Sequence, residues 1–401
     1  MDGTGNVYVT GPSTGAASAD FATIKYDANG NQLWAARYGT QDNQDQSYAI
    51  AVDNAGNVHV TGSTEIGSIS IYATVKYDAN GNEQWVANYG GPGNGANVAN
   101  KVAVDPAGNV YVTGSSTGLD GSPDYATVKY DAAGNQLWVA RYKGTIENRT
   151  AEYAHGLAVD TAGNVYVTGE SMGFGGDTDY VTVKYDANGN QQWAARYGSP
   201  DGNDIAYDVA VDATGNVYVT GSSRDPVASS SSDYATVKYD ANGNQLWVAR
   251  YNNGVQSSTA SALTLDAAGN VYVSGWSRGI GTAEDYATVK YDNNGNQLWV
   301  ARYNGPANGT DVASKIAVDA AGNVIVLGYS ANGTTPYNFA TVKYDANGNQ
   351  LWVERYDGSL NGQDLSTPTA LAVDVAGNIF VGGRALGAGT YLDFVTLKYS
   401  P

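Results

Sequence analysis

The chain has 401 residues, with 51 glycines, 31 tyrosines, 8 tryptophans, no cysteine and a formal net charge of −18. A chain without cysteine cannot form disulfide bridges or thiolate metal sites, and a strongly acidic one is a poor partner for nucleic acid or anionic membranes, which repel it. No apolar run is long enough to cross a bilayer, so we expect no membrane insertion.

One motif recurs along the whole chain. Its clearest copy, residues 124–142, reads Asp-Tyr-Ala-Thr-Val-Lys-Tyr-Asp-Ala-Ala-Gly-Asn-Gln-Leu-Trp-Val-Ala-Arg-Tyr. Two alternating segments around an Asp-x-x-Gly-Asn turn predict a β-hairpin. The tryptophans of the seven full copies lie 51 to 55 residues apart, at Trp34, Trp85, Trp138, Trp193, Trp247, Trp299 and Trp352. An eighth copy is cut short at Tyr399. This spacing indicates a repeat architecture.

Each repeat contains four strand-like segments, as at residues 48–53, 57–62, 72–78 and 83–89. The first is short and alanine-rich, a tight turn leads to the second, a longer polar loop leads to the third, and the hairpin turn leads to the fourth. β-branched and aromatic residues dominate, and no segment has a helical period. We therefore predict an all-β chain.

Four short strands in each unit of about 50 residues predict a β-propeller of four-stranded antiparallel blades. The second and third segments occur eight times, whereas the first and fourth occur seven times. Eight blades with incomplete terminal blades fit this tally directly, and seven blades with an extra strand pair are the alternative. We expect a single domain with blades at residues 1–46, 47–98, 99–151, 152–204, 205–258, 259–311, 312–366 and 367–401.

The hairpin, followed by Ala-Val-Asp-x-x-Gly-Asn-Val-Tyr-Val-Thr-Gly, resembles the SBBP-type β-propeller repeat of large secreted bacterial proteins. That resemblance implies an extracellular or cell-surface setting and no particular activity. The shorter Asp-x-x-Gly-x-x-x-Trp pattern, as at residues 27–34, is similar to the tryptophan-docking hairpins of quinoprotein propellers and concerns blade packing only. The chain opens inside a repeat and without a signal peptide, so we expect it to be a segment of a larger protein.

The tight turns of a blade fall on one face of a propeller and the longer, divergent loops on the other, so a binding site is expected on the loop face. The residue after the glycine of the second strand is Trp276, Tyr329 and Arg384 in three consecutive repeats, and Arg278 lies nearby. An aromatic platform with guanidinium groups could bind a sugar ring or an acidic or aromatic side chain. The alternative is that these side chains only cover loop backbone.

Acidic loop residues could hold Ca²⁺, which prefers several oxygen ligands. The candidates form two clusters, the first of Asp201, Asp204 and Asp208, and the second of Asp42 and Asp45. The chain's two histidines, His59 and His155, lie in different repeats, so we expect no zinc site and no other resident cofactor. His155 near Glu152 could act as a base, although a lone histidine on a propeller strand is more often structural.

The repeated tyrosines, tryptophans, lysines and arginines are interpreted as packing residues. We expect the long cationic side chains to pack on aromatic neighbours and to pair with repeat aspartates such as Asp124 and Asp131.

Three functions remain open. The first is a secreted, non-enzymatic scaffold that binds a protein or glycan through the loop face. The second is an assembly module that joins neighbouring molecules through its incomplete terminal blades. The third is a propeller enzyme (a hydrolase, a lyase or a quinoprotein-like oxidoreductase) with its site at the channel mouth. The scarcity of histidine and the lack of cysteine disfavour an enzyme.

Overall fold

The computed structural model describes residues 1–14, 18–39, 44–144, 151–173, 176–199, 202–224, 231–254, 257–331, 333, 337–358, 367–386 and 392–401. Within these ranges the regular structure is entirely β-strand, and no helix able to cross a membrane is present among them. The strands form eight antiparallel sheets, each of four strands except the first and the last, which have three. The predicted all-β propeller of eight blades with incomplete terminal blades is therefore confirmed.

The strands take the four positions that the repeat predicts. The first strands are β4 (Gln46–Val52), β8 (Asn97–Val104), β12 (Glu152–Val159), β16 (Ile205–Val211), β20 (Ser258–Leu265), β24 (Asp311–Val318) and β28 (Thr367–Val373). The second strands are β1 (Val7–Thr14), β5 (Val58–Ile66), β9 (Val110–Thr117), β13 (Val165–Met172), β17 (Val217–Arg224), β21 (Val271–Arg278), β25 (Val324–Ala331) and β29 (Ile379–Leu386).

The outer half of each blade is the predicted hairpin. The third strands are β2 (Ala19–Tyr26), β6 (Ile69–Tyr77), β10 (Pro123–Tyr130), β14 (Thr178–Tyr185), β18 (Ser232–Tyr239), β22 (Glu284–Tyr291), β26 (Tyr337–Tyr344) and β30 (Leu392–Tyr399). The fourth strands are β3 (Gln32–Tyr38), β7 (Glu83–Tyr89), β11 (Gln136–Tyr142), β15 (Gln191–Tyr197), β19 (Gln245–Tyr251), β23 (Gln297–Tyr303) and β27 (Gln350–Tyr356).

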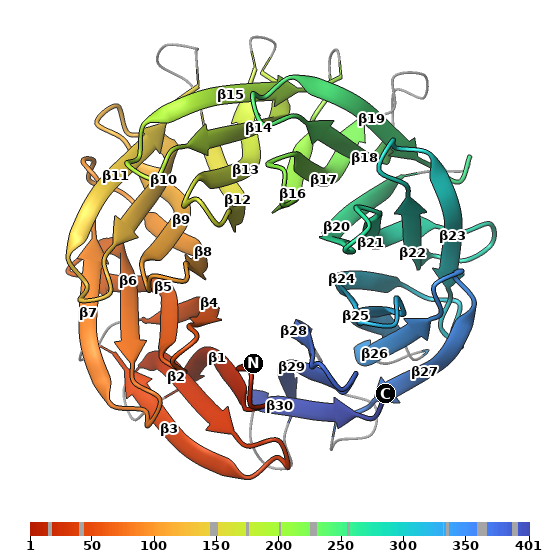
Figure 1. Ribbon diagram of the computed structural model, residues 1–401, viewed down its shortest axis with the longest axis horizontal. Coiled ribbons are helices and arrows are strands. Elements are labelled where there is room, and N and C mark those ends of the chain that lie inside the picture. The colour runs from red at the N-terminus through yellow and green to blue at the C-terminus, as the bar shows by residue number, and fades with distance from the viewer. Residues whose placement is uncertain are drawn as a thin grey trace. The chain divides into compact units, whose positions relative to one another are not determined.

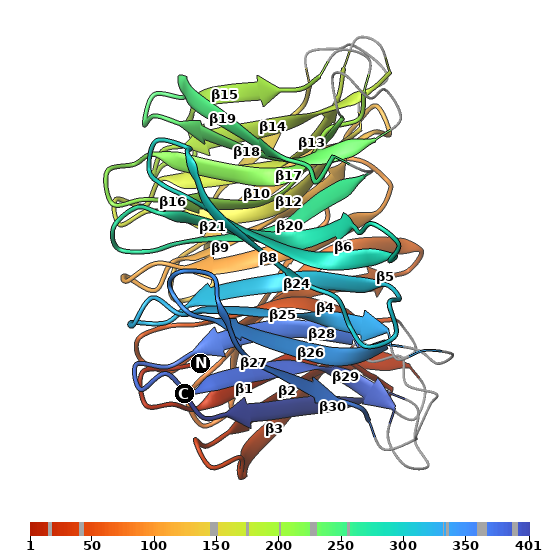
Figure 2. The same cartoon turned by 90° about the vertical axis from the view of Figure 1, so that its right-hand side faces the viewer.

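The chain divides into two compact units, residues 1–215 with 241–243, and residues 216–240 with 244–401. In each unit the first strands of successive blades lie along one side and the fourth strands along the other (Figure 1). The antiparallel order places the tight turns at one end of the sheets, as the second unit shows on the left of Figure 2. The longer connections start from the opposite end.

The tight hairpin turn has a complete local explanation. In the third blade the amide of Gly134 donates to the carbonyl of Asp131 at 3.0 Å, and the amide of Asp131 donates to the carbonyl of Asn135 at 2.9 Å. Gly134 has φ +87°, a left-handed conformation that favours glycine. The Asp131 carboxylate accepts from Asn135 and from the amide of Ala133, and these hydrogen bonds hold its pKa below the usual value.

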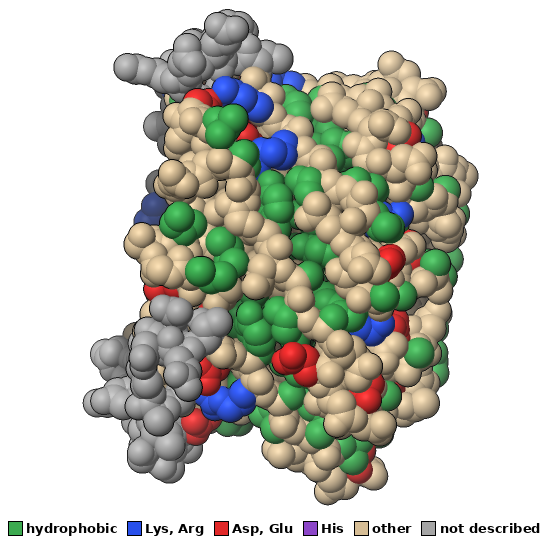
Figure 3. All heavy atoms as spheres, turned by 90° about the vertical axis from the view of Figure 1, so that its left-hand side faces the viewer, with side chains coloured by type: hydrophobic (Ala, Val, Ile, Leu, Met, Phe, Trp, Pro, Cys, Tyr) green, Lys and Arg blue, Asp and Glu red, His purple; other side chains and the backbone are tan. Residues whose placement is uncertain are grey.

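The core lies between adjacent blades. Between the third and fourth blades, Tyr111 and Tyr125 of one sheet pack with Val165, Val167 and Val181 of the next, and all five are fully buried. A single sheet could not cover both of its apolar faces, so stacking of blades supplies the burial that stabilises each one. The surface around β7 and β11 is mostly uncharged, with scattered hydrophobic side chains (Figure 3). Leu137, 52% exposed, is one of the hydrophobic residues that the fourth strands leave in solvent.

Candidate functional site

In six blades of the described chain, the loop-side half is shaped by a β-bulge that the repeat pattern does not reveal. In β12 the register against β13 shifts between Ala154 and Gly156, so His155 is the extra, bulged residue. A Cβ at Gly169, on β13, would lie 2.0 Å from the carbonyl oxygen of Tyr153 and 2.9 Å from the hydroxyl of Tyr125 in the preceding blade. Only glycine fits there, and the next residue begins the divergent part of the strand.

We call the residue after this glycine the rim position. Its occupants are Pro12, Ser63, Ser115, Glu170, Ser222, Trp276, Tyr329 and Arg384. The structure places these residues at one register position of β1, β5, β9, β13, β17, β21, β25 and β29. Trp276, Tyr329 and Arg384 are all half-buried, whereas Arg278, two residues beyond Trp276, is exposed.

The rim of the second unit is ordered by neighbouring side chains. The ring of Tyr329 lies 4.6 Å from that of Tyr337. Burial raises the pKa of Tyr329, and the adjacent Tyr337 and Glu284 raise it further. Glu284 lies opposite Arg278 across the β21–β22 pair, and its carboxylate accepts from Thr310 at 2.7 Å. Glu284 therefore lies close to both Arg278 and Tyr329, in two neighbouring blades.

The predicted rim residues share a register position but do not bond to each other directly. Across the described part of the chain, no hydrogen bond or ring contact joins Trp276, Tyr329 and Arg384. Trp276 lies opposite Tyr286, and Arg384 lies opposite Phe394. They form separate half-exposed points along three blades rather than one closed pocket.

A second group surrounds Glu170, the rim residue of the fourth blade in the first unit, and was not predicted from the sequence. His155 Nε2 lies 3.6 Å from Glu170, the rim residue of its own blade, and its ring lies 5.8 Å from that of Tyr207 on β16. Burial and the nearby Glu170 carboxylate raise the pKa of Tyr207. Tyr153, opposite Glu170 in the sheet, is 41% exposed. The nearest acidic partner of His155 is thus Glu170 rather than Glu152.

Two of the calcium candidates have a structural role. Asp45 and Asp204 are fully buried beside the first strands, where Asp45 accepts from Thr64 and Asp204 accepts from the Ser199 amide at 2.6 Å. The third, Asp208, lies in β16 and accepts from the amide of Val209 at 3.0 Å. Asp42 and Asp201 lie outside the described residues. The described ranges contain no group of three or more histidine, aspartate or glutamate side chains placed to hold a metal ion. Calcium binding in the loops stays a prediction.

The repeated cations hold adjacent blades together, although the lysine partners differ from those expected. Arg141 donates to Asp124 at 2.7 Å, as predicted, and also to Ser116 and to the hydroxyl of Tyr89 in the preceding blade. Lys129 lies over the ring of Tyr111 at 4.9 Å, and its ammonium donates to a backbone carbonyl of the next blade instead of Asp131. The carboxylate of Asp131 is used within its own turn, which explains the difference.

Comparison with known proteins agrees with this architecture. The family model of the SBBP β-propeller repeat matches residues 33–68, 84–120, 140–174 and 192–225. The chain therefore carries SBBP β-propeller repeats, which confirms the resemblance drawn from its sequence. Each match starts in the fourth strand of one blade and ends just beyond the second strand of the next, so the sequence repeat and the blade are out of phase.

Two curated proteins are distantly similar. An uncharacterized WD repeat-containing protein, L264, of Acanthamoeba polyphaga mimivirus is 25% identical, with 92% of this chain and 31% of the viral protein aligned. The regulatory protein FlaEY of Caulobacter vibrioides is 28% identical over 39% of this chain and 19% of that protein. The chain thus spans less than a third of the length of either relative.

Solved structures share the fold. Sqt1 from Chaetomium thermophilum superposes with a TM-score of 0.61 at 12% identity, covering 99% of this chain and 93% of that one. The polysaccharide lyase Uly1 superposes with a TM-score of 0.51, also at 12% identity, covering 87% and 88%. At these identities the likeness shows the β-propeller fold alone.

Proposed function

We propose that this protein is a non-enzymatic β-propeller scaffold that binds a protein or glycan through the loop side of its blades. The observation that carries the proposal is the rim position. Serine stands there in three blades, at Ser63, Ser115 and Ser222, whereas Trp276, Tyr329 and Arg384 stand there in succession. The third strands beside these residues still end in the repeated Thr-x-Lys-Tyr, so the variable rim position lies on a frame that keeps its outer hairpin pattern.

The chemistry of the rim favours a ligand with a flat or apolar face and an anionic group. An indole and a phenol offer faces for stacking, and guanidinium groups bind carboxylates through paired hydrogen bonds. The Tyr329 ring is held against Tyr337, so little side-chain entropy is lost when a ligand packs on it. An acidic sugar and a peptide with aromatic and acidic side chains both meet these requirements.

The setting we propose is extracellular or at a cell surface, in line with the secreted proteins that carry this repeat. A propeller of uniform blades supplies a rigid frame, and its divergent connections present the binding groups. The proposed ligand is a macromolecule or glycan in that setting, and neither nucleic acid nor lipid fits the acidic chain.

Glycan and peptide arrays test this proposal. We expect a ligand that binds the protein and whose affinity falls about tenfold or more in Trp276→Ser or Arg384→Ser. Because serine is the residue at this position in other blades, both variants should keep the fold, which circular dichroism and urea unfolding would verify. Ser222→Ala, at the same register position, is the matched control and should bind normally. An array without ligands, or a ligand whose affinity changes in neither Trp276→Ser nor Arg384→Ser, would contradict the proposal.

A further inference from the structure

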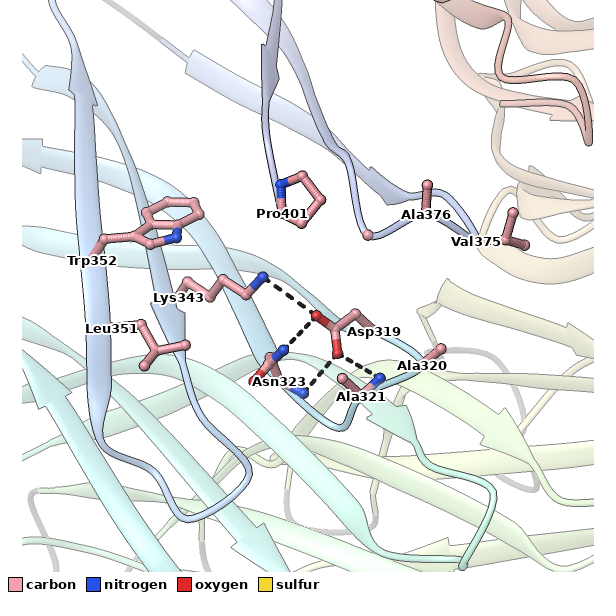
Figure 4. Close-up of a pocket in the computed structure, with 11 residues that line it drawn as sticks. Asp319, Ala320, Ala321, Asn323, Lys343, Leu351, Trp352, Val375, Ala376 and Pro401 are labelled. Carbon is pink, nitrogen blue, oxygen red and sulfur yellow. Dashed lines mark hydrogen bonds and ion pairs between the residues drawn. The ribbon is translucent and has the colours of Figure 1, made fainter.

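Several partly buried carboxylates of this chain are satisfied by neighbouring side chains. In the first unit Asp124 accepts a hydrogen bond from Arg141 at 2.7 Å. In the second unit Asp319 accepts from Asn323 at 2.8 Å, and Lys343 Nζ lies 3.4 Å from the same carboxylate (Figure 4). Withdrawing a carboxylate from water is costly unless such partners replace the water. A partly buried acid that lacks them therefore requires another explanation.

The carboxylate of Glu170, in the fourth blade, is such an acid. Its side chain is 18% exposed, and no lysine, arginine or hydrogen-bond donor among the described residues pairs with it. Nε2 of His155 lies 3.6 Å away, which is too long for a good hydrogen bond. A neutral imidazole also brings no charge to offset the carboxylate. Glu170 therefore places an uncompensated negative charge at the loop-side end of β13.

Aromatic rings lie around this carboxylate. Tyr153 lies directly opposite Glu170 in the β12–β13 pair, so the two side chains are neighbours on one face of the sheet. The His155 ring lies 5.8 Å from the ring of Tyr207 in the next blade. Burial raises the pKa of Tyr207, and the Glu170 carboxylate raises it further, because the phenol lies close to that charge. One carboxylate and two phenols thus gather beside His155 within the first unit.

The preceding blade shows that the repeat does not need this group in order to fold. There Val98 stands opposite the rim residue Ser115, and Asn100 occupies the bulge position. Asn100 donates to the backbone carbonyl of Ala154 at 2.9 Å and so has a structural role. The third blade thus has the same strand pairing without an acid or an aromatic ring at these positions. Blade packing does not explain why the fourth blade carries them.

The group is accessible from solvent on the side of Tyr153. Tyr153 is 41% exposed, and the side chain of His155 is 28% exposed. Nε2 of His155, in contrast, is buried and has no hydrogen-bond partner in the described part of the chain. A ligand can therefore reach Tyr153 and the carboxylate of Glu170, with the His155 ring immediately beside them.

An uncompensated carboxylate beside phenol rings is suited to an organic cation. The carboxylate accepts charge-assisted hydrogen bonds from an ammonium group. A cation is also attracted to the face of an aromatic ring when it lies within about 6 Å of the ring centre. The formal net charge of −18 adds a general attraction for cations. An anionic ligand would be repelled by the same charges.

We propose that Glu170, Tyr153 and Tyr207 form a binding site for an alkylammonium group, such as the side chain of a lysine. The ammonium donates to the carboxylate of Glu170, and the methylene groups next to it pack on the ring of Tyr153. The site lies in the first unit, whereas the rim residues Trp276 and Arg384 lie in the second. The inference therefore does not rest on the ligand proposed for that rim.

The chain's two histidines give a direct test by NMR, with the whole 401-residue protein isotope-labelled only in its histidine rings. The probe is a lysine blocked at both backbone ends, and the spectrum of His155→Asn assigns the two ring signals. The His155 signal should shift saturably as the probe is added, and the signal of the buried His59 should stay in place. The same probe acetylated on its side-chain nitrogen has no charge and should bind about tenfold or more weakly. This comparison leaves the protein unchanged.

Substitutions then locate the site. Glu170→Gln keeps the size of the side chain and removes its charge, so it should weaken binding of the blocked lysine about tenfold or more. Tyr153→Val introduces the residue of the preceding blade and should weaken binding about threefold or more. Glu65→Gln, near the loop-side end of β5 in the same unit, removes the same charge at another place and should bind normally.

A titration with butylammonium distinguishes two sources of the ligand. Equal affinities for butylammonium and blocked lysine would indicate a free amine, and tighter binding of blocked lysine would indicate a polypeptide; either result supports the site. The proposal is wrong if the His155 signal shows no saturable shift, or if the charged and the acetylated probes bind equally. It is also wrong if Glu65→Gln weakens binding as much as Glu170→Gln, because net charge alone would then account for the attraction.

Discussion

We predict that the buried His59 makes the protein less stable in mild acid, and that one substitution removes this pH dependence. In four other blades a tyrosine stands at this position and donates to the aspartate of its tight turn at 2.7–3.0 Å, namely Tyr8, Tyr111, Tyr166 and Tyr272. His59 Nε2 lies 3.5 Å from Asp53, which is too long for a good hydrogen bond. Both ring nitrogens are buried without a hydrogen-bond partner among the described residues.

Burial, assisted by the positive charge of Lys76, lowers the pKa of His59 to about 4. An unfolded histidine titrates near pH 6.5, so between about pH 6.5 and pH 4 the unfolded chain binds more protons than the folded one. Stability is therefore lost as the pH falls through this window. From these two pKa values the loss is about 2 kcal/mol at pH 5 and about 3 kcal/mol below pH 4, relative to pH 8.

His59→Tyr restores the repeat residue and removes the titrating group. We expect the variant to lose about 2 kcal/mol less than the wild type between pH 7 and pH 5. At pH 8 it should also gain about 1 kcal/mol from a hydrogen bond to Asp53. Urea unfolding followed by tryptophan fluorescence at several pH values measures both effects. The hydrogen bonds that Asp53 accepts from Asn57 and Ala55 hold its pKa below the usual range, so the stability that depends on this carboxylate is lost at lower pH.

The chain offers a matched control for this experiment. His155 is the other histidine, and Asn100 occupies the equivalent bulge position of the preceding blade. His155→Asn should therefore leave unchanged the slope of the unfolding free energy against pH that we attribute to His59. If the unfolding free energy of His59→Tyr falls as steeply as that of the wild type between pH 6.5 and pH 5, burial of His59 does not cause the loss of stability in acid, and the prediction is wrong.

Two further substitutions test the packing between blades. Gly134→Ala should destabilise the protein by about 1 kcal/mol for the left-handed backbone and by about 1–3 kcal/mol more for the collision with Trp85. Gly30→Ala, at φ +86° but with nothing within 4 Å of the new Cβ, should show the backbone cost alone, and equal urea midpoints for the two variants would reject the packing explanation. Arg141→Ala should cost about 2 kcal/mol by leaving Asp124, whose side chain is 7% exposed, without its cationic partner. Chemical denaturation measures this loss, and a value near zero would mean that the ion pair contributes no more than a surface one.

The sequence predicts the local structure well because that structure is encoded locally. The alternation of Tyr125, Thr127 and Lys129 with Ala126, Val128 and Tyr130 specifies a strand that is buried on both faces. The Asp-x-x-Gly-Asn pattern specifies the turn through hydrogen bonds within five residues. Counting such segments is enough to obtain eight blades, with three strands in the first and the last.

The candidate sites were predicted less completely. The rim position was visible in the sequence because Trp276, Tyr329 and Arg384 break a repeated pattern. The pairing of His155 with Glu170 was not, since it depends on a bulge in β12 that changes which residues face each other across the sheet. A bulge leaves the alternation of side chains almost unchanged and so gives no clear signal in sequence.

The sequence by itself determined the strands, the turns, the number of blades and the packing role of the repeated tryptophans, because short-range periodicity and turn chemistry specify all of them. Only the tertiary structure decided what those tryptophans contact. Trp85 meets a backbone carbonyl of the next blade, 47 residues away, and the glycine beside that carbonyl is needed because it lies on the indole. Every residue carries a backbone carbonyl, so the sequence does not show which one accepts the hydrogen bond from the indole. The contacts of Trp34, Trp85, Trp138, Trp193, Trp247 and Trp299 with the next hairpin turn therefore became visible only when the blades were stacked.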